Sequence, residues 1–143
     1  MSEVENKNSN ISGLRVLLVE DNLADRQLIK SILKKMGIVQ IEEVDGGRGA
    51  SIQIQNSILN DNIFNLIITD WSMPQGSGLD LISQIRLEKK LTHTAVVLVT
   101  SVPAGAKAGV GLKIGVDELI VKPIQISEFA MKIEKLIQKL VQS

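Results

Sequence analysis

Short runs of aliphatic residues recur along the chain, and stretches with helical spacing separate them. Each run has the length of a β-strand. The runs are Val16–Val19, Val39–Val44, Leu66–Thr69, Ala95–Thr100 and Leu119–Val121. Strands that alternate with helices form parallel sheets covered on both faces, and such strands are nearly continuously aliphatic. The sequence therefore predicts an α/β fold in three layers, with a parallel sheet of five strands in the middle.

Three of the intervening stretches carry a clear helical stripe of apolar residues. These stripes run over Leu28–Met36, Leu79–Ile85 and Phe129–Leu140. Gly37 follows the first stripe as a natural C-terminal cap, and Ser127 stands where it could cap the start of the last helix. These signals predict helices that lie on the sheet.

Two other stretches predict helices less directly. Residues 48–59 contain Ile52 and Ile54, which alternate as in a strand, but the interval between neighbouring strands favours a crossover helix. Ser101–Gly115 would be the fourth helix, and glycine costs about 1 kcal/mol per helical position relative to alanine. Its glycines fit either a frayed helix of no functional meaning or a low-stability signalling element.

The chain has 143 residues, which suits one domain, predicted here over residues 14–143. Residues 1–13 are mostly polar and are expected to form a flexible leader. Lysine plus arginine (16) balances aspartate plus glutamate (16), so no basic field would attract nucleic acid or a membrane surface. Cysteine is absent and no signal peptide or long apolar run is found, so we expect a cytoplasmic protein.

Polar residues follow the predicted strands at their carboxyl ends. Glu20 and Asp21 follow the first strand, Asp70 the third, Thr100 ends the fourth, and Lys122 follows the fifth. The functional crevice of an open parallel sheet lies beyond these strand ends. We therefore expect the three acids, the hydroxyl and the lysine to meet at one edge of the sheet.

Such a group of acids calls for a cation. Two carboxylates about 4 Å apart repel by roughly 4 kcal/mol at an effective dielectric constant near 20. A hard divalent ion such as Mg²⁺ relieves this repulsion and binds carboxylates, water and a substrate phosphate. Asp70 would keep an oxygen for attack on a phosphoryl group, which Lys122 and Thr100 would then stabilise.

At these residues the chain resembles the receiver domains of two-component response regulators, most closely the stand-alone chemotaxis type (CheY-like). The resemblance runs from about Leu14 to Leu140. Its motifs are "LLVEDN", "IITDWSMPQGSGLDL", "VVLVTS" and "GVDELIVKP". It implies a flavodoxin-like (βα)₅ fold with strand order 2-1-3-4-5.

The resemblance also implies roles for individual residues. Asp70 would be the phosphoacceptor; Glu20, Asp21, Asp70 and the backbone carbonyl of Ser72 would bind Mg²⁺. Thr100 and Lys122 would contact the phosphoryl group, and the bond from Lys122 to Pro123 is often cis in this family. The phosphodonor would be a sensor histidine kinase or a small acyl phosphate. The output would be a contact with a downstream protein, such as a motor switch or phosphorelay component.

One position departs from the family pattern. The family usually has an aromatic switch residue three positions before the lysine, where this chain has Leu119 and contains no tyrosine. Leu119 could be a core residue or could still change rotamer as Thr100 moves. The output signal could differ accordingly.

Three other functions compete with a phosphorylated switch. A receiver-fold adaptor or phosphorelay intermediate without a conventional aromatic switch stays open because of Leu119. An aspartate-nucleophile phosphatase is disfavoured, since Ser72 stands where a second aspartate would act as acid and base. An FMN binder is disfavoured because Glu20 and Asp21 would repel its phosphate. We therefore expect a phosphoacceptor switch and not an enzyme, with at most intrinsic self-phosphorylation and autodephosphorylation.

Overall fold

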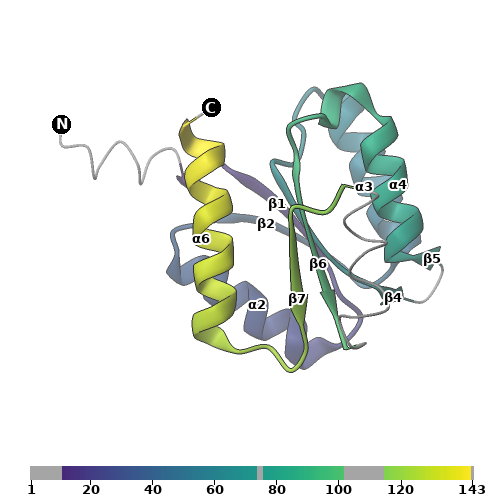
Figure 1. Ribbon diagram of the computed structural model, residues 1–143. Coiled ribbons are helices and arrows are strands. Elements are labelled where there is room, and N and C mark those ends of the chain that lie inside the picture. The colour runs from purple at the N-terminus through teal and green to yellow at the C-terminus, as the bar shows by residue number, and fades with distance from the viewer. Residues whose placement is uncertain (1–10, 74–75, 102–114, 143) are drawn as a thin grey trace.

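The computed structural model describes residues 11–73, 76–101 and 115–142. Its centre is a parallel five-stranded sheet in the order β2-β1-β3-β6-β7 (Figure 1). These strands are β1 (Arg15–Val19), β2 (Gln40–Val44), β3 (Leu66–Asp70), β6 (Ala95–Thr100) and β7 (Glu118–Val121). Counted along the chain, the order is 2-1-3-4-5, so the predicted sheet and its topology are confirmed.

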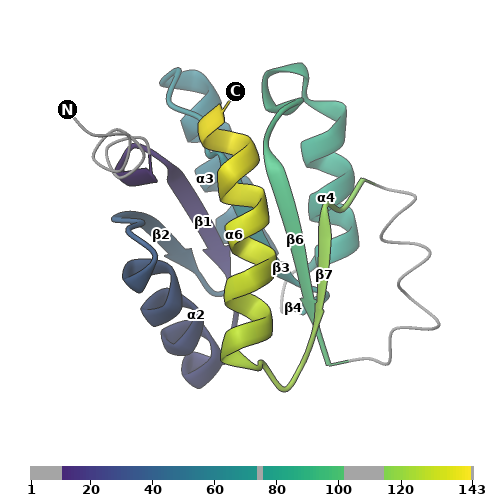
Figure 2. The same cartoon turned by 60° about the vertical axis from the view of Figure 1, so that its left-hand side comes forward.

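In the described part of the chain, four helices cover the sheet. They are α2 (Leu23–Lys35), α3 (Gly47–Leu59), α4 (Gly78–Leu87) and α6 (Ile126–Gln142). Figure 2 shows α2 and α6 in front of the sheet, with α3 and α4 behind it. The ambiguous stretch 48–59 is a helix, because Ile54 faces the core while Ile52 is exposed to solvent.

The core lies in two halves, one on each face of the sheet. Successive side chains of a strand point to opposite faces, so Val16 and Leu18 pack with α2 and α6, while Leu17 and Val19 pack with α3 and α4. All four of these β1 side chains are fully buried. The aliphatic runs are nearly continuous because both faces of the sheet are covered.

Some boundaries differ from those expected. Val39 is 65% exposed and β2 begins one residue later, at the edge of the sheet. Helix α6 begins at Ile126, so Ser127 lies inside its first turn and does not precede it as a cap. A short antiparallel hairpin, β4 (Ser72–Met73) with β5 (Gly76–Ser77), follows β3 and was not predicted.

Two predictions concern segments that are largely outside the described residues. The expected leader, residues 1–13, is described only from Ile11, which packs against the core beside α2 and α6. The expected fourth helix, Ser101–Gly115, is described only at its two end residues. Within the described ranges, no helix is both long and apolar enough to cross a membrane.

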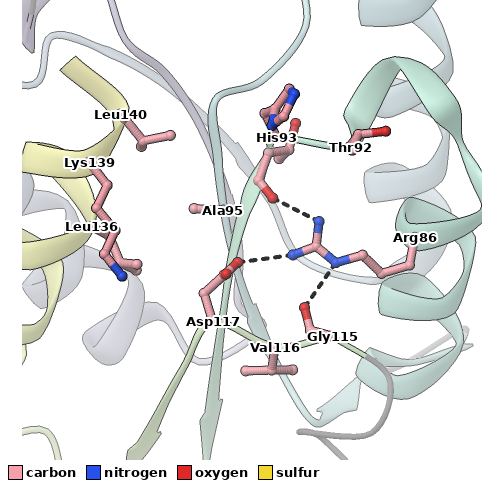
Figure 3. Close-up of a pocket in the computed structure, with 11 residues that line it drawn as sticks. Arg86, Thr92, His93, Ala95, Gly115, Val116, Asp117, Leu136, Lys139 and Leu140 are labelled. Carbon is pink, nitrogen blue, oxygen red and sulfur yellow. Dashed lines mark hydrogen bonds and ion pairs between the residues drawn. The ribbon is translucent and has the colours of Figure 1, made fainter. Parts of the chain in front are cut away.

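Arg86, in the last turn of α4, ties this helix to the amino ends of β6 and β7 (Figure 3). Its guanidinium donates to the carbonyl oxygens of Gly115 and Thr94 and to Asp117 Oδ2, each at 2.9 Å. Asp117 Oδ2 also accepts from the backbone N–H of Val96 at 2.8 Å. These contacts line a hollow of about 440 Å³ at the edge of the sheet opposite the carboxyl ends of the strands.

Gly78 allows α4 to begin close to the end of β3. Its backbone N–H donates to the carbonyl oxygen of Trp71 at 2.7 Å. A Cβ atom at this position would lie 2.2 Å from the carbonyl oxygen of Asp70, which is far closer than atoms can approach. The chain can therefore follow this path just after Asp70 only because Gly78 has no side chain.

We predict that Arg86→Met lowers the free energy of unfolding by about 1–3 kcal/mol, because two carbonyl groups and Asp117 lose a charged donor. The measurement is urea denaturation followed by circular dichroism. Lys89→Met is the control, since it removes an exposed cation from the neighbouring turn, and it should change stability by less than about 0.5 kcal/mol. Equal stability of the two variants would contradict the role given to Arg86.

We predict opposite effects for two glycine substitutions. Gly78→Ala should lower the free energy of unfolding by about 1–3 kcal/mol, since its Cβ would overlap the Asp70 backbone. Gly49→Ala should raise it by about 0.5 kcal/mol, because alanine favours a helix and its Cβ would meet Val44 at an ordinary 3.4 Å. Urea denaturation measures both; a stabilising Gly78→Ala would show that the close approach is not needed.

Candidate functional site

The carboxyl ends of the sheet strands lie level with one another, at the lower edge of the sheet in Figure 1. Asp70 pairs with Val99 and Thr100 pairs with Val121, so β3, β6 and β7 end side by side. The backbone N–H of Lys122 donates to the carbonyl oxygen of Thr100 at 2.7 Å. This parallel register brings side chains that are far apart in the sequence to one edge.

Glu20, Asp21 and Asp70 form an acidic group at this edge. Each offers a carboxylate oxygen, and the three oxygens lie within 4.8 Å of one another. Glu20 is 1% exposed and Asp70 8% exposed, whereas Asp21 is open to solvent. The predicted convergence of the three acids is confirmed.

Lys122 lies among the acids and contacts three carboxylates. Its Nζ lies 2.7 Å from Glu20 Oε1 and 3.0 Å from Asp25 Oδ2. It also donates to Asp70 Oδ2 at 2.9 Å. The predicted meeting of Lys122 with Asp70 is therefore confirmed, and the peptide bond from Lys122 to Pro123 is cis, as the resemblance implies.

Asp25 belongs to the site but was missed in the sequence, because it lies in the first turn of α2 and not at a strand end. Asn22 caps this helix, and its Oδ1 accepts from the backbone N–H of Asp25 at 2.9 Å. The backbone N–H of Asn22 in turn donates to Glu20 Oε2 at 3.1 Å. An asparagine three residues before an acid, shortly after a strand, is the signal that could have placed Asp25 at the edge.

Burial and charge act in opposite directions on the two most buried ionisable groups. Burial raises the pKa of Glu20 to about 7 and the charge of Asp70 adds to the rise, although Lys122 and the Asn22 N–H favour the carboxylate. Burial alone would lower the pKa of Lys122, but its contacts with the carboxylates of Glu20, Asp70 and Asp25 hold the pKa above its ordinary value. The lysine therefore stays charged while Glu20 resists ionisation.

The acidic group fits a hard divalent cation. Glu20 Oε1 is buried, and its charged partner among the described residues is the Lys122 ammonium, 2.7 Å away, in an ion pair without hydrogen-bond geometry. Carboxylate oxygens are the protein ligands that Mg²⁺ prefers. A cation beside Glu20 would favour its ionised form, which burial disfavours.

The remaining predicted residues lie nearby. Thr100 is buried at the end of β6, and Leu119 is partly buried in the same half of the core as Trp71. Ser72 lies in β4, two residues beyond Asp70, and ligation of a metal by its carbonyl stays a prediction.

The chain is similar to known signalling proteins over most of its length. The family model of the response regulator receiver domain matches residues 16–134. Chemotaxis protein CheY-3 of Vibrio cholerae is 29% identical over 140 residues, which are 98% of this chain and all of that protein. The CheY homolog of Campylobacter jejuni is 30% identical over 121 residues, 85% of this chain and 90% of that protein.

Solved structures share the fold. The signal receiver domain of a histidine kinase from Syntrophus aciditrophicus matches with a TM-score of 0.76 and 27% identity, over 90% of this chain and 93% of that one. CheY4 of Vibrio cholerae matches in fold with a TM-score of 0.76 and 24% identity, over 86% of this chain and 98% of that one. With its acidic group beside Lys122 and a family match over residues 16–134, the chain belongs to the response regulator receiver domains of two-component signal transduction.

Proposed function

We propose that Asp70 is the phosphoacceptor of this receiver domain and that phosphorylation changes its contact with a downstream protein. One observation carries the proposal: the Asp70 carboxylate accepts from the Lys122 ammonium at 2.9 Å and also offers an oxygen within 4.8 Å of oxygens of Glu20 and Asp21. A nucleophilic carboxylate is thus set between a fixed cation and a group of metal ligands.

We assign Mg²⁺ to the carboxylates of Glu20, Asp21 and Asp70, with the backbone carbonyl of Ser72 as a further ligand. The buried Oε1 of Glu20, which makes an ion pair with Lys122 but no hydrogen bond, supports this assignment. When bound, Mg²⁺ supplies positive charge that offsets both the carboxylates and an incoming phosphoryl group.

In the proposed reaction an oxygen of Asp70 attacks the phosphorus of the donor. The P–O bond to Asp70 forms while the bond to the donor breaks, and the leaving group keeps that electron pair. The leaving group is the imidazole of a phosphohistidine or the carboxylate of a small acyl phosphate. Lys122 and Thr100 then hold the phosphoryl oxygens, an interaction that exists only in the phosphorylated state.

The donor protein is a sensor histidine kinase, and the reader is a motor switch or phosphorelay component in the cytoplasm. The relatives named as chemotaxis proteins support this class of partner. The domain would act as a switch without turnover of an external substrate, apart from self-phosphorylation and autodephosphorylation. Leu119, which packs against the same half of the core as Trp71, would pass on the change without an aromatic ring.

We predict that acetyl phosphate with Mg²⁺ places alkali-labile phosphate on the wild-type protein and none on Asp70→Asn, because a carboxamide is a poor nucleophile. The measurement is phosphate released by mild alkali from the denatured protein. Asp80→Asn is the control, since Asp80 is an exposed acid in the first turn of α4, and it should label like wild type.

Two results would contradict this prediction. Equal labelling of wild type and Asp70→Asn would remove Asp70 from the proposed role. A folded wild-type protein that binds Mg²⁺ but takes no label would favour an adaptor that works without phosphorylation.

We predict that Mg²⁺ changes the fluorescence of Trp71, the sole tryptophan, because this residue directly follows Asp70. Asp21→Asn should weaken Mg²⁺ binding about tenfold, since one charged ligand is lost. Glu43→Gln is the matched control: Glu43 pairs with Arg26 and Lys30, lies outside the acidic group, and should alter the affinity less than about twofold. Equal affinities of wild type and Asp21→Asn would exclude Asp21 as a ligand.

A further inference from the structure

The ammonium of Lys122 has as many acidic partners as it has N–H groups. A lysine ammonium carries three donors, and carboxylate oxygens of Glu20, Asp70 and Asp25 lie 2.7, 2.9 and 3.0 Å from Nζ. The contact to Asp70 is a hydrogen bond, and those to Glu20 and Asp25 are ion pairs. A phosphoryl oxygen that approaches the ammonium therefore has to displace at least one of these carboxylates.

Asp25 differs from the other two partners of Lys122. Glu20 and Asp70 belong to the acidic group that can hold a metal ion, and Asp25 lies outside it. A cation bound to that group would draw the oxygens of Glu20 and Asp70 away from Lys122. Asp25 would then be the carboxylate that still holds the lysine.

Asp25 is held in place independently of Lys122. Its backbone N–H is bound by the Asn22 side chain at the start of α2, and this bond does not involve the Asp25 carboxylate. The Asp25 side chain is 29% exposed, and that of Lys122 is 14% exposed. A substitution of the carboxylate alone would therefore leave the helix cap intact and change chiefly the partners of Lys122.

We propose that Asp25 is a positioning residue that holds Lys122 in the unphosphorylated protein and competes with the phosphoryl group for its ammonium. The inference rests on the proposed phosphorylation of Asp70. Loss of the Asp25 charge frees the lysine and removes a repulsion of the phosphoryl oxygens, and both effects favour the phosphorylated state. Before phosphorylation the freed Lys122 would contact Glu20 and Asp70 more strongly, and it would therefore compete with the metal ion for these two carboxylates.

The test measures two affinities by Trp71 fluorescence, for Mg²⁺ alone and for beryllofluoride, a phosphoryl mimic, at saturating Mg²⁺. In Asp25→Asn, beryllofluoride should bind about threefold tighter, while Mg²⁺ binds no tighter than in wild type. Asp25→Ala should show at least the same gain, because it removes the remaining hydrogen-bond acceptor as well. A residue that merely supports the structure of the site would weaken both affinities when replaced.

Two further variants show whether the effect passes through Lys122. Glu43→Gln removes a nearby carboxylate that contacts Arg26 and Lys30, and it should leave beryllofluoride binding unchanged. In the background of Lys122→Met, Asp25→Asn should bring a clearly smaller gain, because only the removed repulsion remains. The difference between the two gains is the interaction energy of a double-mutant cycle.

The outcomes separate this inference from the proposed function. If wild type binds beryllofluoride and Asp25→Asn binds it equally or more weakly, the competition is excluded and the phosphoacceptor role of Asp70 stands. A gain of the same size without Lys122 would also overturn the inference. If wild type binds Mg²⁺ but no beryllofluoride, the proposed phosphorylation fails, and the inference fails with it.

Discussion

The ion contacts of Lys122 hold together an edge of the sheet that would otherwise repel itself. Carboxylates of Glu20, Asp25 and Asp70 surround this one ammonium, and Asp21 adds a fourth negative group nearby. A buried carboxylate is costly unless a charge or a hydrogen bond compensates it. Glu20 is nearly inaccessible to solvent, so its carboxylate depends on Lys122 when no metal is bound. Because of this dependence, a cation or an anion that binds at this edge must rearrange the contacts between Lys122 and the carboxylates.

Helix α4 connects this edge to the opposite end of the sheet. Its first residue, Gly78, packs against the backbone of Asp70, and Arg86 in its last turn binds Gly115 and Asp117 just before β7. Strand β7 then leads back across the sheet to Lys122. The segment that follows Asp70 and the lysine are thus held in place by one helix and one strand. This frame explains how two side chains 52 positions apart keep a separation of 2.9 Å.

Much of the fold was predictable because the sheet is covered on both faces. Short, nearly continuous aliphatic runs predict the strands, and their parallel arrangement predicts that Glu20, Asp21, Asp70 and Lys122 meet at one edge. The boundary at Val39 was wrong because an apolar residue at a sheet edge need not be buried. The hairpin of β4 and β5 was missed because two-residue strands carry no periodic signal.

Asp25 was missed for a different physical reason. The residues that directly follow an aliphatic run lie at the strand ends and are easily identified in the sequence. A helix that starts at the same edge of the sheet also places its first turn there. Asn22 follows β1 closely and starts α2, so the acid three residues later returns to the site. A search for acids should therefore include the first turn of every helix that follows a strand end.

The three carboxylate partners of Lys122 also bear on how a receiver without an aromatic switch residue can respond. Phosphorylation would add roughly one further negative charge at Asp70. Lys122 already contacts three carboxylates, so it could bind the phosphoryl group only if it leaves one of them. If Lys122 left Asp25, it would release a residue in the first turn of α2. If it left Glu20, a buried carboxylate would lose its charged partner. The first costs less, since Asp25 can be solvated where it stands. The least costly rearrangement at this edge therefore runs between β7 and α2, and it requires no aromatic side chain at Leu119.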